Sequence, residues 1–426
     1  MRKYFLLLFF ILPVVVAFSQ QTITYMQYNL LNYGNLTSYC TTTNNDQEYK
    51  DGYLRTILDY IQPDILAVNE VGRSSANANR LLDEVLNENN YGVTYQRADI
   101  TNNANSYIIN VFFYNPEKVK LESQAVAQSV LRDINHYRLY AVNENLSKGD
   151  TTFLNCFVTH LKAGYDHEDE ELRGTMTRNL MNYLEWNEIQ EAVLFSGDMN
   201  FYSDSEEGVE NLMEHPDDLV RFYDPVNKMG DWHNNSYYAQ YHTQSTHADY
   251  NGCAASGGMD DRFDFVFINK SIRDGLHGVT YIDYSYKAVG NDGQHFNKSI
   301  NDYPDNNSVP ADVLNALYQN SDHLPVVMEM EMETEIGIAE NDLTYPRIQV
   351  VNPAQDKIEV KVYSKEVMDY TVQIFDLTGR LAAQNSEKLN PGSTILNLQK
   401  PDISGMYLVV MQFGNGKRIA ERVLVF

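Results

Sequence analysis

The stretch Phe195-Ser196-Gly197-Asp198-Met199-Asn200 is the point around which this sequence is organised. The apolar run Ala192 to Phe195 predicts a buried strand that stops at Gly197, where the backbone can turn. Asp198 and Asn200 then project from the end of the strand, which is where open α/β sheets bind their ligands. Such a pair can hold a metal-bound or phosphate oxygen, although Gly-Asp is also ordinary turn chemistry.

Other polar side chains stand at or near the ends of further predicted strands. Apolar or alternating runs predict strands at Thr22–Leu30, Asp64–Glu70, Thr152–His160, Phe263–Ile268 and Leu324–Met330, and a helix at Glu168–Glu188. The polar residues at these strand ends are Asn29, Glu70, His160, Asp264, Asp322 and His323. Strands that alternate with helices, together with extra strand pairs, predict an α/β sandwich of two sheets with these groups on one rim.

The residue types in this set favour metal-assisted hydrolysis. Glu70, Asn29 and Asp322 offer hard oxygen ligands, which suit Mg²⁺ or Ca²⁺ better than zinc or copper. Two histidines, His160 and His323, can divide the general-base and general-acid roles. Cleavage of a phosphodiester passes through a crowded phosphorus whose added charge a cation and amide donors would stabilise.

Six motifs in this order resemble those of the endonuclease/exonuclease/phosphatase superfamily and span about residues 22 to 335. They are Tyr28-Asn29-Leu30-Leu31, Val68-Asn69-Glu70, Thr159-His160-Leu161-Lys162-Ala163-Gly164, Gly197-Asp198-Met199-Asn200, Arg262-Phe263-Asp264-Phe265-Val266 and Ser321-Asp322-His323. The resemblance implies a two-sheet, four-layer α/β sandwich like that of deoxyribonuclease I. With a histidine at position 160, the chain is more similar to the deoxyribonuclease I and sphingomyelinase branches than to abasic-site endonucleases.

The resemblance also implies a role for each matched position. Glu70, helped by Asn29, would bind the catalytic Mg²⁺, with Ca²⁺ or Mn²⁺ as alternatives; Asp322 would assist the metal or His323. His160 and His323 would form the acid/base pair. Asp198 and Asn200 would bind and polarise the scissile phosphate or the attacking water. Asp264 would hydrogen-bond His323 and fix its tautomer.

Two further residues are candidate substrate contacts, and one position departs from the family pattern. Tyr107 resembles a nuclease tyrosine that touches the substrate backbone, and Arg73, just after Glu70, is a candidate phosphate contact. Deoxyribonuclease I carries a glutamate that orients the first histidine, whereas Ile109 occupies that place here. Either another acid supports His160 or the role of His160 is weaker.

The two ends of the chain predict export. Residues 1–19 combine a basic start, an apolar run and a small-residue cleavage pattern, which is typical of a secretory signal peptide. The catalytic region then covers residues 20–335, followed by a linker at 336–345. Residues 346–426 predict only short strands, as in a small all-β sandwich. Their motifs Asn352-Pro353-Ala354, Asp376-Leu377-Thr378-Gly379-Arg380 and Ile403-Ser404-Gly405-Met406-Tyr407 resemble the sorting domain of the Bacteroidetes type IX secretion system.

Charge and cysteine usage restrict the possibilities further. The net charge is −26, and the part between the signal peptide and Tyr345 carries −30, so tight coating of a polyanion is excluded. A divalent cation among acidic ligands would still admit a phosphodiester.

With three cysteines the chain is not a disulfide scaffold. Cys156 lies in an apolar strand, which leaves Cys40 and Cys253 as the plausible pair.

The sequence therefore predicts a secreted, monomeric, Mg²⁺-dependent phosphodiester hydrolase without a membrane span, most of all an extracellular endonuclease acting on nucleic acid. The alternatives are a sphingomyelin or phospholipid phosphodiesterase and a non-catalytic cell-surface binding protein. The type IX secretion machinery would be a partner. The loop Trp232–Gly258 is crowded with aromatic residues. It either packs its own rings on the surface or forms a substrate platform for bases or lipid.

Overall fold

The computed structural model describes residues 20–142 and 151–334, and residues 346–426 apart from 351–353, 355–356, 365–366, 391, 402 and 415. The chain divides into two compact units, Met1–Gly337 and Ile338–Phe426. The predicted signal peptide, residues 1–19, and the predicted linker, residues 336–345, lie outside the described residues.

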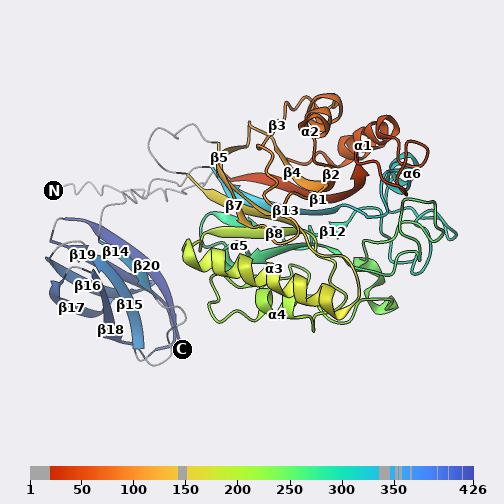
Figure 1. Ribbon diagram of the computed structural model, residues 1–426. Coiled ribbons are helices and arrows are strands. Elements are labelled where there is room, and N and C mark those ends of the chain that lie inside the picture. The colour runs from red at the N-terminus through yellow and green to blue at the C-terminus, as the bar shows by residue number, and fades with distance from the viewer. Residues whose placement is uncertain are drawn as a thin grey trace, which may run out of the picture. The chain divides into compact units, whose positions relative to one another are not determined.

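The first unit contains two mixed β-sheets (Figure 1). One has the order β11-β13-β1-β2-β4-β3, with β12 also paired to β13; the other has the order β5-β6-β7-β8-β10-β9. The strands of the first sheet are β1 (Gln20–Tyr33), β2 (Ile65–Gly72), β3 (Gln96–Arg97), β4 (Ile108–Tyr114), β11 (Val279–Tyr281), β12 (Lys287–Ala288) and β13 (Val326–Glu333). Those of the second are β5 (Val119–Gln128), β6 (Ile134–Ala141), β7 (Phe153–His160), β8 (Ala192–Asp198), β9 (Phe222–Tyr223) and β10 (Asp264–Asn269).

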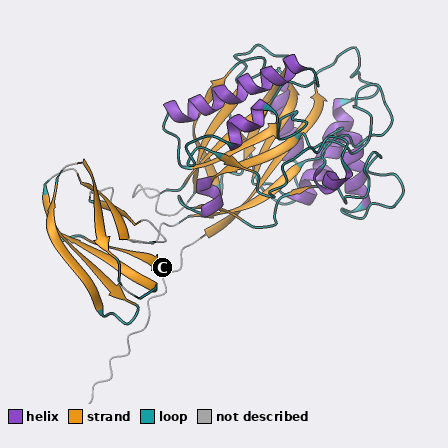
Figure 2. Cartoon of the chain, turned by 90° about the horizontal axis from the view of Figure 1, so that it is seen from below, coloured by secondary structure: helices purple, strands orange, loops and turns teal. Residues whose placement is uncertain are grey.

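Helices cover the outer faces of both sheets, as Figures 1 and 2 show. The first sheet packs against α1 (Gln47–Ile61), α2 (Ser75–Arg80), the π-helical turn Leu81–Leu86 and α6 (Ala311–Asn320). The second packs against α3 (His167–Trp186) and α4 (Glu207–Met213). The short helices α5 (Lys270–Asp274) and the 3₁₀ helix Ser236–Tyr241 complete the unit. This order of helix, sheet, sheet and helix confirms the predicted four-layer α/β sandwich.

Strand β1 explains how the layers arise from the sequence. Its alternating side chains point to opposite faces, so Ile23 and Tyr25 enter the core between the sheets, whereas Met26 and Tyr28 pack under the helices. Both faces of the strand are therefore buried. Toward its C-terminal end the inward-facing residues change from Tyr25 to Gln27 and then Asn29, which are fully buried polar groups.

The same change from apolar to polar residues occurs at the matching ends of neighbouring strands. Along β7 the inward residues run from Cys156 through Val158 to His160. Along β8 they run from Leu194 to Asp198, and β10, which is antiparallel to β8, begins with Asp264 directly opposite Asp198. The apolar core between the sheets therefore ends in a layer of buried polar side chains on one rim.

The second unit is a separate all-β sandwich, as predicted. A three-stranded sheet contains β14 (Arg347–Val350), β15 (Lys357–Ser364) and β18 (Gly392–Gln399); a four-stranded sheet contains β17 (Leu381–Leu389), β16 (Met368–Asp376), β19 (Gly405–Phe413) and β20 (Arg418–Val425). Alternating apolar residues of both sheets, such as Val360, Val372 and Val409, form one core. Across both units, no described helix has the length and apolarity needed to cross a membrane.

A disulfide bond joins the two cysteines that the sequence left as a pair. Cys40, between β1 and α1, is bonded to Cys253, between the 3₁₀ helix and β10, at a sequence separation of 213. Beside it, Asn44 Nδ2 donates to the backbone oxygen of Asn251 (3.4 Å). The third cysteine, Cys156, is fully buried and free, as predicted.

We expect the double substitution Cys40→Ser and Cys253→Ser to lower the free energy of unfolding by about 2–4 kcal/mol, because the bond closes a very long loop in the unfolded chain. Urea denaturation of the oxidised protein and of the variant measures this difference. Reduction of the native protein should produce the same fall, and reductant should leave the variant unchanged. An unchanged denaturation midpoint after reduction would contradict the prediction.

Candidate active site

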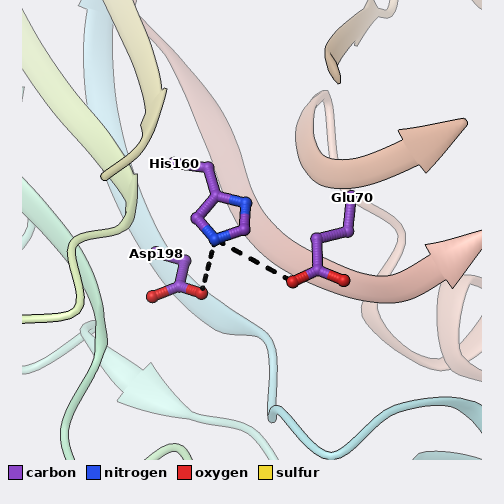
Figure 3. A group of neighbouring side chains, drawn as sticks. All are labelled: Glu70, His160 and Asp198. Atoms are coloured by element: carbon purple, nitrogen blue, oxygen red, sulfur yellow. Dashed lines mark ion pairs between the residues drawn. The ribbon is translucent and has the colours of Figure 1, made fainter. Parts of the chain in front are cut away.

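Three predicted site residues converge closely on the polar rim. The ligand atoms of Glu70, His160 and Asp198 all lie within 4.8 Å of one another. His160 Nε2 is 3.5 Å from Asp198 Oδ2 and 3.9 Å from Glu70 Oε1, and Figure 3 shows the imidazole edge directed at both carboxylates. His160 and Asp198 are buried, whereas 15% of the Glu70 side chain is exposed.

Irregular backbone aims two of the polar groups into the site. Glu70 has φ of 60° at a shift in the register between β2 and β4. Asn200, just after β8, has φ of 51°. Non-glycine residues with positive φ are uncommon, and contacts with the surrounding structure hold them in this backbone conformation.

The strand predicted to stop at Gly197 instead continues through it to Asp198, and Gly197 is paired with Phe265 of β10. Gly197 has φ of 150°, and a Cβ added there would lie 1.9 Å from the backbone oxygen of Thr159. Only glycine fits that position.

His323 lies next to this group and is held by Asp264. Its Nδ1 is 2.6 Å from Asp264 Oδ2, and its Nε2 is 3.7 Å from Asp198 Oδ2. Burial by itself favours the neutral ring, but the carboxylates of Asp264 and Asp198 outweigh it and hold the pKa of His323 well above its ordinary value. The predicted hydrogen bond between Asp264 and His323 is therefore present, and of the two histidines His323 is the one whose surroundings favour the protonated form.

His160 has the opposite electrostatics. Burial, followed by the positive charges of Arg132 and His323, holds the pKa of His160 well below its ordinary value. The side chain of Ile109 is buried, and no described residue offers a hydrogen bond to His160 Nδ1. Of the two possibilities that the sequence left open, support by another acid has no counterpart at Nδ1 among the described residues, whereas the carboxylates of Asp198 and Glu70 face Nε2.

Asp198 stands between the two histidines in an unfavourable environment for its charge. Burial, together with the like charges of Asp264 and Glu70, raises the pKa of Asp198 to about 7, although His323 and Asn29 oppose the shift. Asn29 Nδ2 donates to Asp198 Oδ2 (2.9 Å) and to Glu70 Oε1 (3.1 Å). Asn29 therefore joins the two carboxylates to one another.

A network of buried amides holds these residues in place. Asn69 accepts hydrogen bonds from the backbone N–H of Asp198 (3.1 Å) and from Gln27 Nε2 (2.7 Å), and Gln27 Nε2 also donates to Asp264 Oδ1 (3.1 Å). Asn200 N donates to Asp198 Oδ1 (3.2 Å). Buried amides with satisfied bonds fix side-chain positions tightly.

Asp322 lies at the border of the site and does not join the Glu70 group. Its Oδ2 accepts hydrogen bonds from the backbone N–H of Ala255 (2.8 Å) and from Gln244 Nε2 (3.3 Å). The amide nitrogen of Gln244 is also 2.7 Å from His323 Nε2. Asp322 is thus connected to His323 through Gln244, a residue that the sequence did not single out.

Arg73 and Tyr107 lie together on the surface. The guanidinium carbon of Arg73 is 5.1 Å from the centre of the Tyr107 ring, and Arg73 Nη1 donates to Asn105 Oδ1 (3.3 Å). Tyr107 is 73% exposed.

Another arginine, Arg132, was not predicted from the sequence. Its Nη1 donates to the backbone oxygens of Leu161 (2.8 Å) and His160 (3.4 Å). It follows β5, a strand that the sequence did not predict.

Comparison with solved structures gives distant similarities. TDP2 from D. rerio complexed with a single-strand DNA product is 13% identical, with a TM-score of 0.44 over 72% of this chain and 98% of that chain. The human Nocturnin catalytic domain with bound sulfate is 15% identical, with a TM-score of 0.44 over 73% and 94%. An endonuclease/exonuclease/phosphatase from Beutenbergia cavernae DSM 12333 is 11% identical, with a TM-score of 0.41 over 94% and 99%. Similarity at this level carries no information on the reaction or the substrate.

The C-terminal unit is identified more directly. No curated protein matches the chain. Residues 349–425 match the family model of the secretion system C-terminal sorting domain. This match confirms the sorting domain predicted for residues 346–426 and indicates export to the cell surface or the extracellular space. The chain therefore ends in a secretion system C-terminal sorting domain.

Proposed function

We propose that the first unit of this exported protein hydrolyses phosphodiester bonds with the help of a divalent cation. The observation that carries the proposal is the convergence of Glu70, His160 and Asp198 beside a histidine, His323, that is charged by Asp264. Paired carboxylates at a cation site, together with a positioned proton donor, are the groups that such a hydrolysis requires.

A divalent cation fits the three converging residues. Two carboxylates and one imidazole nitrogen lie within mutual ligand distance, and the raised pKa of Asp198, which burial and the neighbouring carboxylates cause, marks a place where added positive charge is favourable. A bound cation would neutralise charge that builds on the phosphoryl oxygens and lower the pKa of water in the site. The two carboxylates suit Mg²⁺, Ca²⁺ or Mn²⁺, whereas imidazole is a ligand of transition metals; Mn²⁺ is the one of the three that is a transition metal.

The remaining residues would bind the phosphate and move the proton. The side-chain amide of Asn29 lies beside Asp198 and His323 and would orient the phosphoryl oxygens, and Asn200, whose backbone N–H is bonded to Asp198, would assist it. His323 would hold a proton at Nε2 and donate it to the leaving oxygen, while Asp264 keeps its Nδ1 bonded. We assign His160 to the cation rather than to the acid/base pair, because its Nε2 faces two carboxylates.

Nucleic acid is the substrate that the sequence predicts, with a phospholipid head group as the alternative. The Arg73–Tyr107 pair supports a nucleic acid, because a guanidinium beside an aromatic ring can contact a further phosphate and the sugar next to it. Turnover of DNA, RNA, sphingomyelin and phosphatidylcholine by the full-length protein, with and without divalent cations, tests the reaction class. Absence of turnover for every phosphodiester under every condition would refute the proposal.

We expect EDTA to stop hydrolysis of a p-nitrophenyl phosphodiester and Mn²⁺ to restore it at a lower concentration than Mg²⁺ or Ca²⁺. The substitution His160→Ala should weaken Mn²⁺ binding at least about tenfold and reduce the advantage of Mn²⁺ over Mg²⁺. Calorimetric titration with Mn²⁺ measures the affinity without relying on activity. The matched control is His277→Ala, an exposed histidine beyond the far end of β10. Full activity in EDTA, or equal Mn²⁺ binding by His160→Ala, would contradict the assignment.

A further inference from the structure

Helix α1 carries a buried lysine, Lys50, which is 2% exposed. Its Nζ donates hydrogen bonds to three oxygen atoms: the backbone oxygens of Leu31 (3.1 Å) and Asn320 (2.6 Å), and Asn45 Oδ1 (2.8 Å). Lysine is rarely buried this completely unless a carboxylate pairs with it. Here three neutral oxygens take the place of the carboxylate, and two of them belong to backbone segments that carry residues of the candidate active site.

The first of these segments is a bend near the end of β1. Leu31 and Asn32, the Leu31–Asn32 bend, both have positive φ, 45° and 53°, where the register between β1 and β2 shifts. The N–H of Leu31 donates to Asn29 Oδ1 (3.0 Å). The N–H of Asn32 donates to Glu70 Oε2 (2.9 Å), and the other carboxylate oxygen, Oε1, faces His160. The bend therefore holds the side chains of two site residues.

The backbone oxygens of the Leu31–Asn32 bend are held by Lys50 and Asn45. The oxygen of Leu31 accepts from Lys50 Nζ and from Asn45 Nδ2 (3.0 Å), and the oxygen of Asn32 accepts from Asn45 Nδ2 (3.2 Å). Positive φ costs a non-glycine residue free energy, so it persists only where the surrounding structure holds it. Lys50 and Asn45, which are also bonded to one another, supply such contacts.

The third bond of Lys50 reaches the segment that carries His323. Asn320 is the last residue of α6, which lies beside α1 (Figure 1). An ammonium group is favourable at the C-terminal end of a helix, where backbone oxygens lack partners within the helix. The next residue, Ser321, donates from Oγ to the backbone oxygen of Asn29 (2.7 Å) and accepts from the backbone N–H of His323 (3.1 Å). Lys50 thus connects the two segments.

We propose that Lys50 is a positioning residue of the candidate active site, which holds the Leu31–Asn32 bend so that the Glu70 carboxylate is aimed at the divalent cation. Asn45 shares this role. The inference rests on the cation-assisted hydrolysis proposed above and adds the residues that order its ligands. Lys50 contacts neither Glu70 nor His323 itself and acts through the backbone between them.

The ammonium form of Lys50 makes all three bonds, whereas a neutral amine has only two hydrogens to donate. Burial lowers the pKa of Lys50 to about 7, although the charges of Asp322 and Glu70 oppose the shift. Native protein and variants are therefore best compared at pH 6.5, where the native side chain is mostly charged.

The substitution Lys50→Met keeps the length of the side chain and removes its donors. We expect the Kd for Mn²⁺ to rise at least about tenfold in a calorimetric titration. At saturating Mn²⁺, kcat on a p-nitrophenyl diester should fall about a hundredfold with little change in KM, because the ligands rather than the substrate contacts are displaced. Circular dichroism verifies that the variant is folded. Native values of both Kd and kcat in Lys50→Met overturn the inference.

Lys118→Met is the matched control. Lys118 Nζ donates to the backbone oxygen of Thr22 (2.8 Å), at the opposite end of β1, and is paired with Asp64 (2.8 Å). Its loss should lower the urea midpoint and leave the Kd for Mn²⁺ unchanged. If Lys50→Met likewise lowers only the urea midpoint, Lys50 serves the fold alone and the inference is wrong.

Two further variants keep the test decisive if Lys50→Met does not fold. Lys50→Arg retains a charged donor and should bind Mn²⁺ more tightly than Lys50→Met, or close to the native value. Asn45→Ala leaves Lys50 in place and should weaken Mn²⁺ binding in the same direction. In the double variant with Lys50→Met, Asn45→Ala should add little, because both residues act on the same bend. Native Mn²⁺ affinity in Asn45→Ala, or full additivity of the two losses, overturns the proposed route through the bend.

The binding measurement separates this inference from the reaction. If the variants weaken Mn²⁺ binding but the native protein cleaves no diester with any cation, the proposed function fails and the positioning role stands. If the native protein cleaves diesters and the variants match it in Kd and kcat, the function stands and the positioning role fails. Absence of Mn²⁺ binding by the native protein overturns both.

Discussion

Replacing His323 with alanine is expected to lower kcat for an alkyl phosphodiester by about a thousandfold, with little change in KM. The reason is that His323 carries a proton at the centre of the site, where the leaving alkoxide oxygen needs one. p-Nitrophenolate leaves without protonation, so the same variant should lose much less activity on a p-nitrophenyl diester. Measuring kcat for both leaving groups therefore separates proton donation by His323 from a general loss of structure.

The substitution Asp264→Asn tests how His323 stays protonated. Asp264 and Asp198 raise the pKa of His323 against the effect of burial, so the proposed proton donor should stay protonated above the ordinary histidine range. Loss of the Asp264 charge lowers the pKa of His323. As the pH rises, the variant should therefore lose activity at a lower pH than the native protein does. The alkaline limb of the kcat profile measures the shift. His277→Ala should leave the limb in place. A limb at the same pH in Asp264→Asn would show that another group donates the proton.

The sequence predicted the rim of this site because strand periodicity places polar residues at strand ends. His160 ends an apolar run and Asp264 opens another, so both were expected at the same rim; β8, which ends at Asp198, lies between their two strands. Which of these residues contact one another depends on tertiary structure, and the strand pattern in the sequence does not predict it. Asp322 was grouped with Glu70 by the family resemblance, yet its carboxylate is bonded to Gln244 and to the backbone of Ala255.

The residues that were missed lie where local patterns carry least information. Gln244 belongs to the long aromatic loop, and its contact with His323 joins positions 79 apart in the sequence. Arg132 follows β5, an alternating strand with exposed polar residues and weak apolar signal. The π-helical turn Leu81–Leu86 and helix α6 were likewise not predicted as such.

Of the two interpretations of the aromatic loop, packing holds for Trp232, which is fully buried, whereas His233 lines a pocket beside the site.

Replacing Asp198 with asparagine is expected to reduce kcat/KM by about a thousandfold or more and yet to stabilise the folded protein at pH 8. Activity falls because Asp198 is one of three groups directed at the cation and also supports the charge of His323. Stability rises because the folded protein buries this carboxylate beside Asp264 and Glu70. Asparagine keeps the size of the side chain and one of its two accepted hydrogen bonds, from Asn29 Nδ2 or from Asn200 N, and removes the charge.

The sign of the expected change in stability follows from the pKa of Asp198, which burial raises to about 7 from its ordinary value of 3.8. An acid whose pKa is higher in the folded state stabilises the fold at low pH and loses that contribution as the pH rises through the folded value. Asp198→Asn should therefore gain up to about 4 kcal/mol in unfolding free energy at pH 8 and almost nothing at pH 3. Urea denaturation at the two pH values measures both differences.

Asp64 provides the matched control, because it is a buried aspartate at the opposite end of β2 whose charge is paired with Lys118 (2.8 Å). Asp64→Asn removes a satisfied charge, so it should destabilise the protein at pH 8 and leave turnover unchanged. If Mn²⁺ binds the folded state as proposed, it should stabilise the native protein but not Asp198→Asn, and so reduce the difference in stability between the two. If, in the absence of a cation, Asp198→Asn were instead less stable than the native protein, the Asp198 carboxylate would be contributing to the stability of the fold. A gain in stability coupled to a loss of turnover means that the charge is retained for the reaction, since the fold alone would be better without it.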